Sequence, residues 1–231
     1  MVHVYYHIYS FYNNDNYPII EEQLDLIEKY FNFPFILNIV ICLAEESSNS
    51  STKLFDRLNK TKKPNYIIRD VKTQCNEFAT LELIEKDKQK FANDDLIFYL
   101  HTKGVSRMRT DYVYKKVITW RQMLNYFNIE KVNFVFDIFK NTNYNTYGVL
   151  LTNILTDRED NQKLLTFYSG NFWWMKAEYA KTININDVEK NRYNAETCFI
   201  QCGENWKPYS AYNVSENNHY NIEFKREEYA K

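Results

Sequence analysis

The stretch Leu96–Ser106, "LIFYLHTKGVS", contains the pattern on which the fold prediction rests. A short apolar and aromatic run is followed directly by His101, Thr102, Lys103 and Gly104. Continuous apolar runs of this length are typical of a strand that is buried on both faces. The polar residues that follow are more than a simple turn needs, so we expect them at a ligand site. The alternative is a strand-ending turn in which His101 packs on an aromatic neighbour.

Strands and helices alternate along the rest of the chain. Apolar runs predict strands at 2–11, 34–44, 64–71 and 146–152. Helical spacing predicts helices at 19–32, 77–92, 111–141 (one helix or two) and 194–203, and a short strand turning into a helix at 166–183. This order favours an α/β fold with a mostly parallel central sheet flanked by helices. No repeat or composition break divides the chain, so we expect one domain over residues 1–231.

Ligands in open α/β sheets bind beyond the carboxyl ends of the strands, which places residues 101–104 on the rim of a crevice. There Lys103 offers a point charge for an anionic group, Thr102 offers a hydroxyl, and Gly104 lets the backbone approach the ligand. His101 is a candidate hydrogen-bond donor to a phosphate, or a candidate metal ligand.

Residues after the first and third predicted strands should share this rim. Asp70 follows the third strand, and the loop from Tyr12 to Asn16 follows the first.

A second segment, "FYSGNFWWMK" at 167–176, predicts a tight turn at Gly170 and Asn171. The adjacent Trp173 and Trp174 must point to different faces. We expect one in the core and the other offering a flat face on which a sugar or a base can stack. The alternative is two core tryptophans on a helix.

A third segment, "RYNAETCF" at 192–199, brings Arg192 and Glu196 close together in sequence. Arg192 is a candidate for neutralising a phosphate, and Glu196 for the general base of an acceptor hydroxyl. The alternative is structural: Asn194 caps a helix, and Glu196 lies in the first turn where the helix dipole favours an acid. In "TWRQMLNYF", Trp120 is expected in the core and Arg121 in solvent, with a position at the crevice as the alternative for Arg121.

The composition limits the partners. The 231 residues carry a formal net charge of −1, whereas proteins that bind duplex DNA or anionic membranes usually have a basic excess. No apolar run approaches the roughly 18 residues of a membrane span, and the N-terminal residues do not resemble a secretory signal. We therefore expect no nucleic acid partner, no membrane span and a cytoplasmic location. The four cysteines are expected to be free thiols.

Several nucleotide and hydrolase motifs do not occur in the sequence. There is no Gly-rich phosphate loop, no dinucleotide fingerprint and no Gly-x-Ser-x-Gly element. No Asp-x-Asp stands at a strand end, where it would hold a divalent metal against a diphosphate. Asp94 and Asp95 precede the strand at 96 and so belong to the opposite edge of the sheet.

The chain resembles a set of glycosyltransferases found in bacterial surface-polysaccharide loci and large DNA viruses. It is more distantly similar to rhamnan-synthesis glycosyltransferases, which carry a similar "HTK" at a strand end. The resemblance extends in order over residues 96–200, through "YLHTKGVS", "WRQMLNYF", "YGVLLT", "FYSGNFWWMKAEYAKTI" and "RYNAETCFI".

This resemblance implies a GT-A type fold, with a nucleotide-sugar-binding half over about residues 1–105 and an acceptor-binding half over about 106–231. It implies a nucleoside-diphosphate sugar donor and a glycan or other hydroxyl acceptor. Where the fold normally carries Asp-x-Asp, this chain has His101 to Lys103. Lys103 and His101 are therefore expected to stabilise the diphosphate, and Mn²⁺ or Mg²⁺ stays open as a cofactor.

The resemblance also implies the remaining site roles. Asp70 and the edge from Tyr9 to Tyr12 are expected to contact the nucleobase of the donor. Glu196 matches the catalytic carboxylate of an inverting transfer, and Gly170, Asn171, Trp173 and Trp174 match the acceptor-side wall. Two other functions remain open. One is a carbohydrate- or protein-binding module without turnover, and the other is a different nucleotide-handling enzyme, such as a nucleotidyltransferase or a phosphohydrolase.

Overall fold

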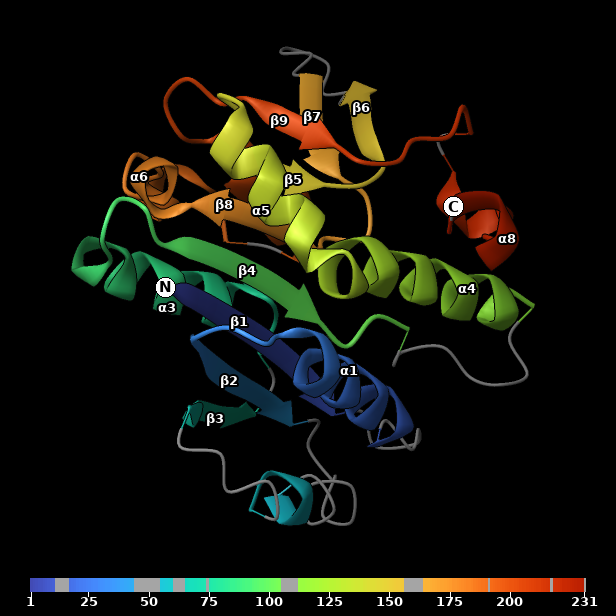
Figure 1. The fold of residues 1–231 in the computed structure, drawn as a ribbon, viewed down its shortest axis with the longest axis horizontal. Coiled ribbons are helices and arrows are strands. Elements are labelled where there is room, and N and C mark those ends of the chain that lie inside the picture. Colours follow the sequence, from blue (N-terminus) through green and yellow to red (C-terminus); the bar gives the residue numbers. More distant parts are fainter. Residues whose placement is uncertain are drawn as a thin grey trace.

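The computed structural model describes residues 1–10, 17–43, 55–59, 65–73, 75–104, 112–155, 164–190, 192–216 and 218–230. Within these residues, helices cover both faces of a central twisted sheet (Figure 1). None of the helices in this part of the chain has the length and apolar character of a membrane span.

A seven-stranded sheet runs through both halves of the chain in the order β3-β2-β1-β4-β8-β5-β9. Its strands pair in parallel except for β8, which is antiparallel to β4 and β5. The predicted α/β class with a mostly parallel sheet between helices is confirmed. The strands of this sheet are β1 (Val2–Ser10), β2 (Phe35–Leu43), β3 (Tyr66–Thr73), β4 (Leu96–His101), β5 (Thr146–Gly148), β8 (Trp173–Lys176) and β9 (Pro208–Ser210).

The helices fall into two layers, one on each face of the sheet (Figure 1). The first layer contains α1 (Tyr17–Tyr30), α4 (Tyr114–Asn125) and α5 (Val132–Asn141). The second layer contains α3 (Phe78–Asp87), α6 (Ala177–Ala180) and α7 (Arg192–Thr197). The short helix α8 (Arg226–Tyr229) packs beside α4. The 3-10 turns are Lys88–Lys90, Ile185–Asp187, Phe199–Gln201 and His219–Asn221.

Alternating side chains of the central strands fill the two cores. Tyr6 and Phe98 face the layer of α1, α4 and α5, whereas Tyr5 and Tyr99 face the layer of α3. All four side chains are fully buried. Because successive strand residues point to opposite faces, a strand covered on both sides must be apolar at every position. This requirement explains the unbroken apolar run in "LIFYL".

The long helical region at 111–141 is two helices, as one of the two sequence alternatives allowed. A π-helical turn, Tyr126–Glu130, joins α4 to α5. Such turns leave backbone carbonyl groups available to other partners. Here the carbonyl oxygen of Asn128 accepts a hydrogen bond from Trp174 Nε1 at 3.0 Å, which ties the helix junction to β8.

The predicted strand at 146–152 is two strands in different sheets. After β5 the backbone of Leu150 takes a positive φ of 54°, and its N–H donates to the Tyr212 carbonyl oxygen at 2.7 Å. The chain then leaves the central sheet and forms a separate antiparallel hairpin, β6 (Leu151–Leu155) with β7 (Leu164–Tyr168).

The prediction of a strand turning directly into a helix at 166–183 is wrong for the tryptophan pair. The expected turn at Gly170 and Asn171 is present, with φ of 97° and 55°. It is followed by a second strand, β8, and the helix begins only at Ala177. The turn lays β8 against β4, so Trp173 and Trp174 are paired strand residues. Tertiary packing here overrides the helical spacing of the sequence.

The expectation of free thiols is wrong for one pair of cysteines. Cys42, near the end of β2, and Cys75, before α3, form a disulfide with their Cα atoms 5.6 Å apart. The two positions are 33 residues apart in sequence, so spacing alone gave no indication of the pairing. Cys198 and Cys202 are free thiols.

The packing around β4 predicts that the same substitution, Phe to Leu, will lower the free energy of unfolding by different amounts at two positions. Phe98 is fully buried, whereas Phe134 on α5 is 41% exposed. We expect Phe98→Leu to lower the free energy of unfolding by about 1–3 kcal/mol and Phe134→Leu by less than about 0.5 kcal/mol. Urea denaturation of both variants measures the difference. Equal losses would contradict the placement of the core around β4.

Candidate functional site

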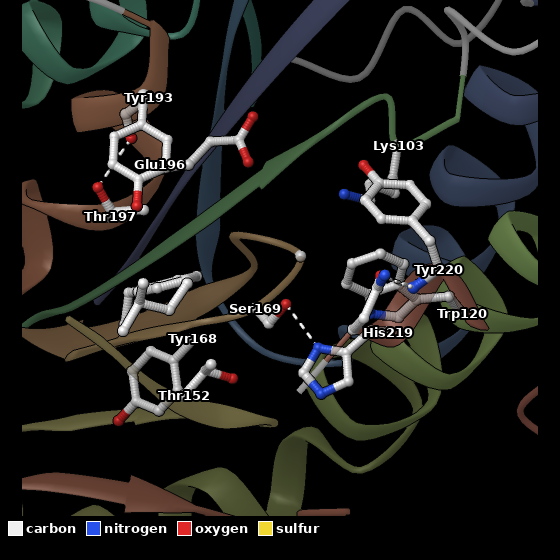
Figure 2. Close-up of a pocket in the computed structure, with 14 residues that line it drawn as sticks. Lys103, Trp120, Thr152, Tyr168, Ser169, Tyr193, Glu196, Thr197, His219 and Tyr220 are labelled. Atoms are coloured by element: carbon white, nitrogen blue, oxygen red, sulfur yellow. Dashed lines mark hydrogen bonds between the residues drawn. The ribbon is translucent and has the colours of Figure 1, made fainter. Parts of the chain in front are cut away.

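A pocket of about 350 Å³ lies beyond the carboxyl end of β4. The strand order reverses its direction between β1 and β4, and ligands of open α/β sheets bind at such a point. The lining residues come from the loop after β4, from α4, from the β6–β7 hairpin, from α7 and from residues 218–220 (Figure 2). Lys103, Gly170 and Glu196, all candidates from the sequence, lie on this one pocket.

Lys103 supplies the positive charge of the pocket. Its residue is only 7% exposed, and its Nζ lies 4.1 Å from the ring centroid of Trp120 and 5.6 Å from that of Tyr220. Among the described residues Lys103 forms no ion pair. A buried ammonium group held by aromatic faces keeps its N–H donors available, so it can bind an anionic group that enters the pocket.

Hydrogen bonds hold the backbone around Lys103 in place. Thr102 is buried, its N–H donates to the carbonyl of His7, and its Oγ1 accepts from Tyr9 N at 2.9 Å. Arg121 is buried as well, contrary to the expectation of a solvated side chain. Its Nη1 donates to the carbonyl of Lys103 at 3.2 Å, and its Nη2 pairs with Glu22 at 3.0 Å.

The other residues of "HTKG" support this loop and do not line the pocket. The ring of His101 is buried, and its Nε2 is 3.0 Å from the carbonyl oxygen of Gly170, to which it donates. Gly104 has a φ of 94°, and a Cβ atom there would lie 2.9 Å from Val117 Cγ1. The close packing against α4 thus explains why residue 104 is a glycine. The predicted ligand contacts of His101, Thr102 and Gly104 are therefore corrected to structural roles.

His219 belongs to the pocket and was missed by the sequence analysis. Its Nδ1 lies 2.7 Å from Ser169 Oγ, and its ring meets the Trp120 ring at 66° and 5.5 Å (Figure 2). Burial lowers the pKa of His219 below its usual value, the charge of Glu216 opposes this shift, and the charge of Lys103 adds to it. Because its pKa is lowered, the imidazole is neutral at pH 7. When Nδ1 accepts from the Ser169 hydroxyl, the single N–H of the ring is on Nε2 and is the donor left for a ligand.

The opposite wall of the pocket is formed by α7. Glu196 and Tyr193 are three residues apart on this helix and both line the pocket, as Figure 2 shows. The helix begins at Arg192, so Asn194 is not its N-cap as expected, and the Asn194 side chain donates to the carbonyl of Glu189 at 3.0 Å. A carboxylate therefore faces the pocket from the side across from Lys103.

Most of the residues predicted for the donor do not reach the pocket. Asp70 lies inside the edge strand β3, not after it, and pairs with Lys72 at 3.2 Å. Tyr9 is in β1 and does not line the pocket. Tyr12 lies outside the described residues, as does the side chain of Arg192.

The predicted acceptor wall is also corrected. Trp173 and Trp174 are at most 1% exposed, and Asn171 is 2% exposed. Trp173 stacks on Tyr99, and its Nε1 donates to Asn171 Oδ1 at 2.9 Å. Trp174 stacks on Phe98. Neither indole offers a face to a ligand, and Gly170 is the part of this turn that lines the pocket.

The site has no obvious metal ligands within the described part of the chain. No group of three or more His, Cys, Asp or Glu side chains is placed there to hold an ion. His101 was the candidate metal ligand from the sequence. Its Nε2 is hydrogen-bonded to the carbonyl oxygen of Gly170.

Comparison with known proteins gives no family assignment. No protein-family model matches the chain, and no curated protein matches it. Among solved structures 28 chains match. One of these is a 4-diphosphocytidyl-2C-methyl-D-erythritol synthase, with 9% identity and a TM-score of 0.38 over 99% of this chain and 95% of that chain. A superposition with so low a score carries no argument about activity.

His7 is buried beside the pocket loop, and from its burial we predict that the free energy of unfolding falls in acid. It pairs in register with His101, its Nδ1 lies 2.9 Å from Thr80 Oγ1, and its Nε2 has no partner among the described residues. Burial, with a further contribution from His101, lowers its pKa to about 3. Between about pH 6.5 and 3 the unfolded chain therefore binds a proton that the folded chain does not.

We expect the free energy of unfolding to fall as the pH falls through this range, by up to about 1.4 kcal/mol per pH unit for this group. Urea denaturation at about pH 7.5, 6 and 5 should show a shallower dependence for His7→Gln than for the wild-type chain. Parallel pH profiles for the two proteins would contradict this, because they would show that His7 binds its proton as readily in the folded chain as in the unfolded chain.

Proposed function

We propose that the chain is a glycosyltransferase, which moves a sugar from a nucleoside-diphosphate donor to a hydroxyl acceptor with inversion. The observation that carries this proposal is the placement of Lys103 and Glu196 on opposite walls of one pocket (Figure 2). The resemblance of "HTKG" and "GNFWW" to glycosyltransferase segments supports it independently.

The leaving group would lie at the Lys103 wall. When the bond between the anomeric carbon and the diphosphate breaks, negative charge develops on the departing phosphate oxygen. A preorganised cation and a neutral imidazole N–H stabilise charge most where it develops in the transition state. Lys103 on the Trp120 ring and His219 beside it supply these two groups.

The acceptor would be activated at the opposite wall. Glu196 accepts the proton of the acceptor hydroxyl, whose oxygen forms the new bond to the anomeric carbon as the old bond breaks. Inversion requires the attacking oxygen and the leaving group on opposite sides of that carbon. A base and a cation on facing walls of a pocket meet this requirement, whereas adjacent groups would not.

The "GNFWW" segment contributes to this site through the fold. Its tryptophans pack on β4, and its turn presents Gly170 to both His101 and the pocket. A Cβ atom at Gly170 would lie 2.7 Å from Leu124 Cδ1, and the φ of 97° disfavours other residues. The segment thus shapes the pocket floor rather than contacting the sugar through its indoles.

Lys103→Ala should weaken nucleotide binding by roughly 10- to 100-fold, because a charge-assisted contact to the diphosphate is lost. The measurement is the melting temperature with a panel of nucleoside diphosphates and nucleotide sugars, each with Mn²⁺ and with EDTA. Lys131→Ala is the matched control, since Lys131 also lies over a tyrosine ring, at 5.3 Å, but away from the pocket.

A saturable shift that persists in EDTA and disappears in Lys103→Ala would support a lysine-held diphosphate. A shift that needs Mn²⁺ would mean that a metal shares this task. If no nucleotide raises the melting temperature of the wild-type chain, the glycosyltransferase proposal fails and a binding module without turnover becomes the better account.

Glu196→Gln should leave the nucleotide shift unchanged and lower the rate of sugar transfer by about 10²- to 10⁴-fold, since the general base is removed. Glu82→Gln is the control, because Glu82 forms an exposed pair with Lys190 and such pairs contribute little to stability. Full transfer activity in Glu196→Gln would assign the base to another group.

A further inference from the structure

The α7 side of the pocket presents apolar surface to solvent. Tyr193 is 51% exposed and Ile154 is 37% exposed, and both line the pocket together with the largely buried Phe167. Single exposed apolar residues are normal on a protein surface. Here, however, residues from α7, β6 and β7 converge on one concave site next to a carboxylate, which is the usual composition of a small-molecule site.

The position of Tyr193 relative to Glu196 is fixed by the helix. Residues three apart on a helix are neighbours on one face, so Tyr193 and Glu196 lie on the same side of α7 and both line the pocket. The Thr197 hydroxyl donates to the Tyr193 carbonyl at 2.9 Å within the same turn. In Figure 2 Tyr193, Glu196 and Thr197 form one wall, and Lys103, Trp120, His219 and Tyr220 form another.

The two walls differ in charge, and this difference selects the ligand group at each. A phosphate is attracted to Lys103 and repelled by Glu196. The wall of Tyr193 and Glu196 suits a neutral group that has one apolar face and hydrogen-bond donors around its rim. A pyranose ring has this form, because its C–H groups cover an aromatic face while its hydroxyl groups donate to a carboxylate.

We infer that Tyr193 is the stacking platform of an acceptor subsite, which holds the terminal pyranose of the acceptor with one of its hydroxyl groups at Glu196. This inference rests on the proposed function, since it names the acceptor of that reaction as a carbohydrate. It also replaces the buried tryptophans with an exposed tyrosine as the aromatic surface of the site. Ile154 and Phe167 of the β6–β7 hairpin line the same pocket.

The test is saturation-transfer NMR with a panel of methyl and 4-nitrophenyl hexopyranosides. The proteins are the wild-type chain, Tyr193→Ala, Tyr193→Phe and Tyr112→Ala. Tyr112 is 82% exposed and does not line the pocket, so its variant controls for the loss of a surface tyrosine. We expect at least one glycoside to bind the wild-type chain, with saturation strongest on the protons of one ring face.

Tyr193→Ala should bind this glycoside roughly tenfold more weakly, which is the effect of removing an aromatic anchor, whereas Tyr193→Phe and Tyr112→Ala should bind it as the wild type does. In a transfer assay Tyr193→Ala should raise KM for the acceptor and leave the nucleotide-induced shift unchanged. Equal glycoside binding by Tyr193→Ala and the wild-type chain, or no binding of any glycoside by the wild-type chain, would overturn the subsite.

The two proposals fail separately. If nucleotides bind through Lys103 but the glycoside does not depend on Tyr193, the subsite is wrong and the glycosyltransferase proposal stands. If glycosides bind through Tyr193 while no nucleotide binds, the sugar site stands and the transfer reaction is wrong. A nucleoside without phosphate that competes with the glycoside would assign the Tyr193 wall to a base, and would also overturn the subsite.

Discussion

The pairing of β4 with β8 is the contact on which the rest of the structure depends. It joins the parallel strands of the first half to the strands of the second half in one sheet. Trp174 stacks on Phe98 at 4.5 Å on one face, and Trp173 stacks on Tyr99 at 4.9 Å on the other. The two indoles therefore clamp the strand pair from both sides. Large aromatic contacts of this kind dominate the energetics of a core.

The same pairing brings the loop after β4 next to the turn before β8. His101 donates to the Gly170 carbonyl across this junction, and Lys103 follows two residues later. Of residues 101–104, which the structure describes in full, only Lys103 lines the pocket. The four residues at this strand end are thus divided between one side chain that lines the pocket, that of Lys103, and three residues that hold its position.

The sequence predicted the strands of the first half well, because buried parallel strands appear as continuous apolar runs and need no distant information. It placed Lys103 correctly beyond a strand end by the same logic. The tryptophan pair was misread because its environment is set by β4, about 75 residues earlier in the sequence. His219 was missed because residues 204–231 show no periodicity, and only the fold brings His219 to Ser169.

The order in which the pocket walls occur along the chain has a consequence for biosynthesis. Synthesis runs from the N-terminus onward, and β1, β2 and β4 are all made by residue 101. The sheet is nevertheless incomplete at that point, because β4 pairs with β8 and packs against α4 and α5. The wall that carries His219 and Tyr220 is held to α4 by the bond from Phe224 N to Thr119 Oγ1 at 3.1 Å. A nascent chain therefore completes its core and its pocket only late in synthesis, because both depend on residues of the second half.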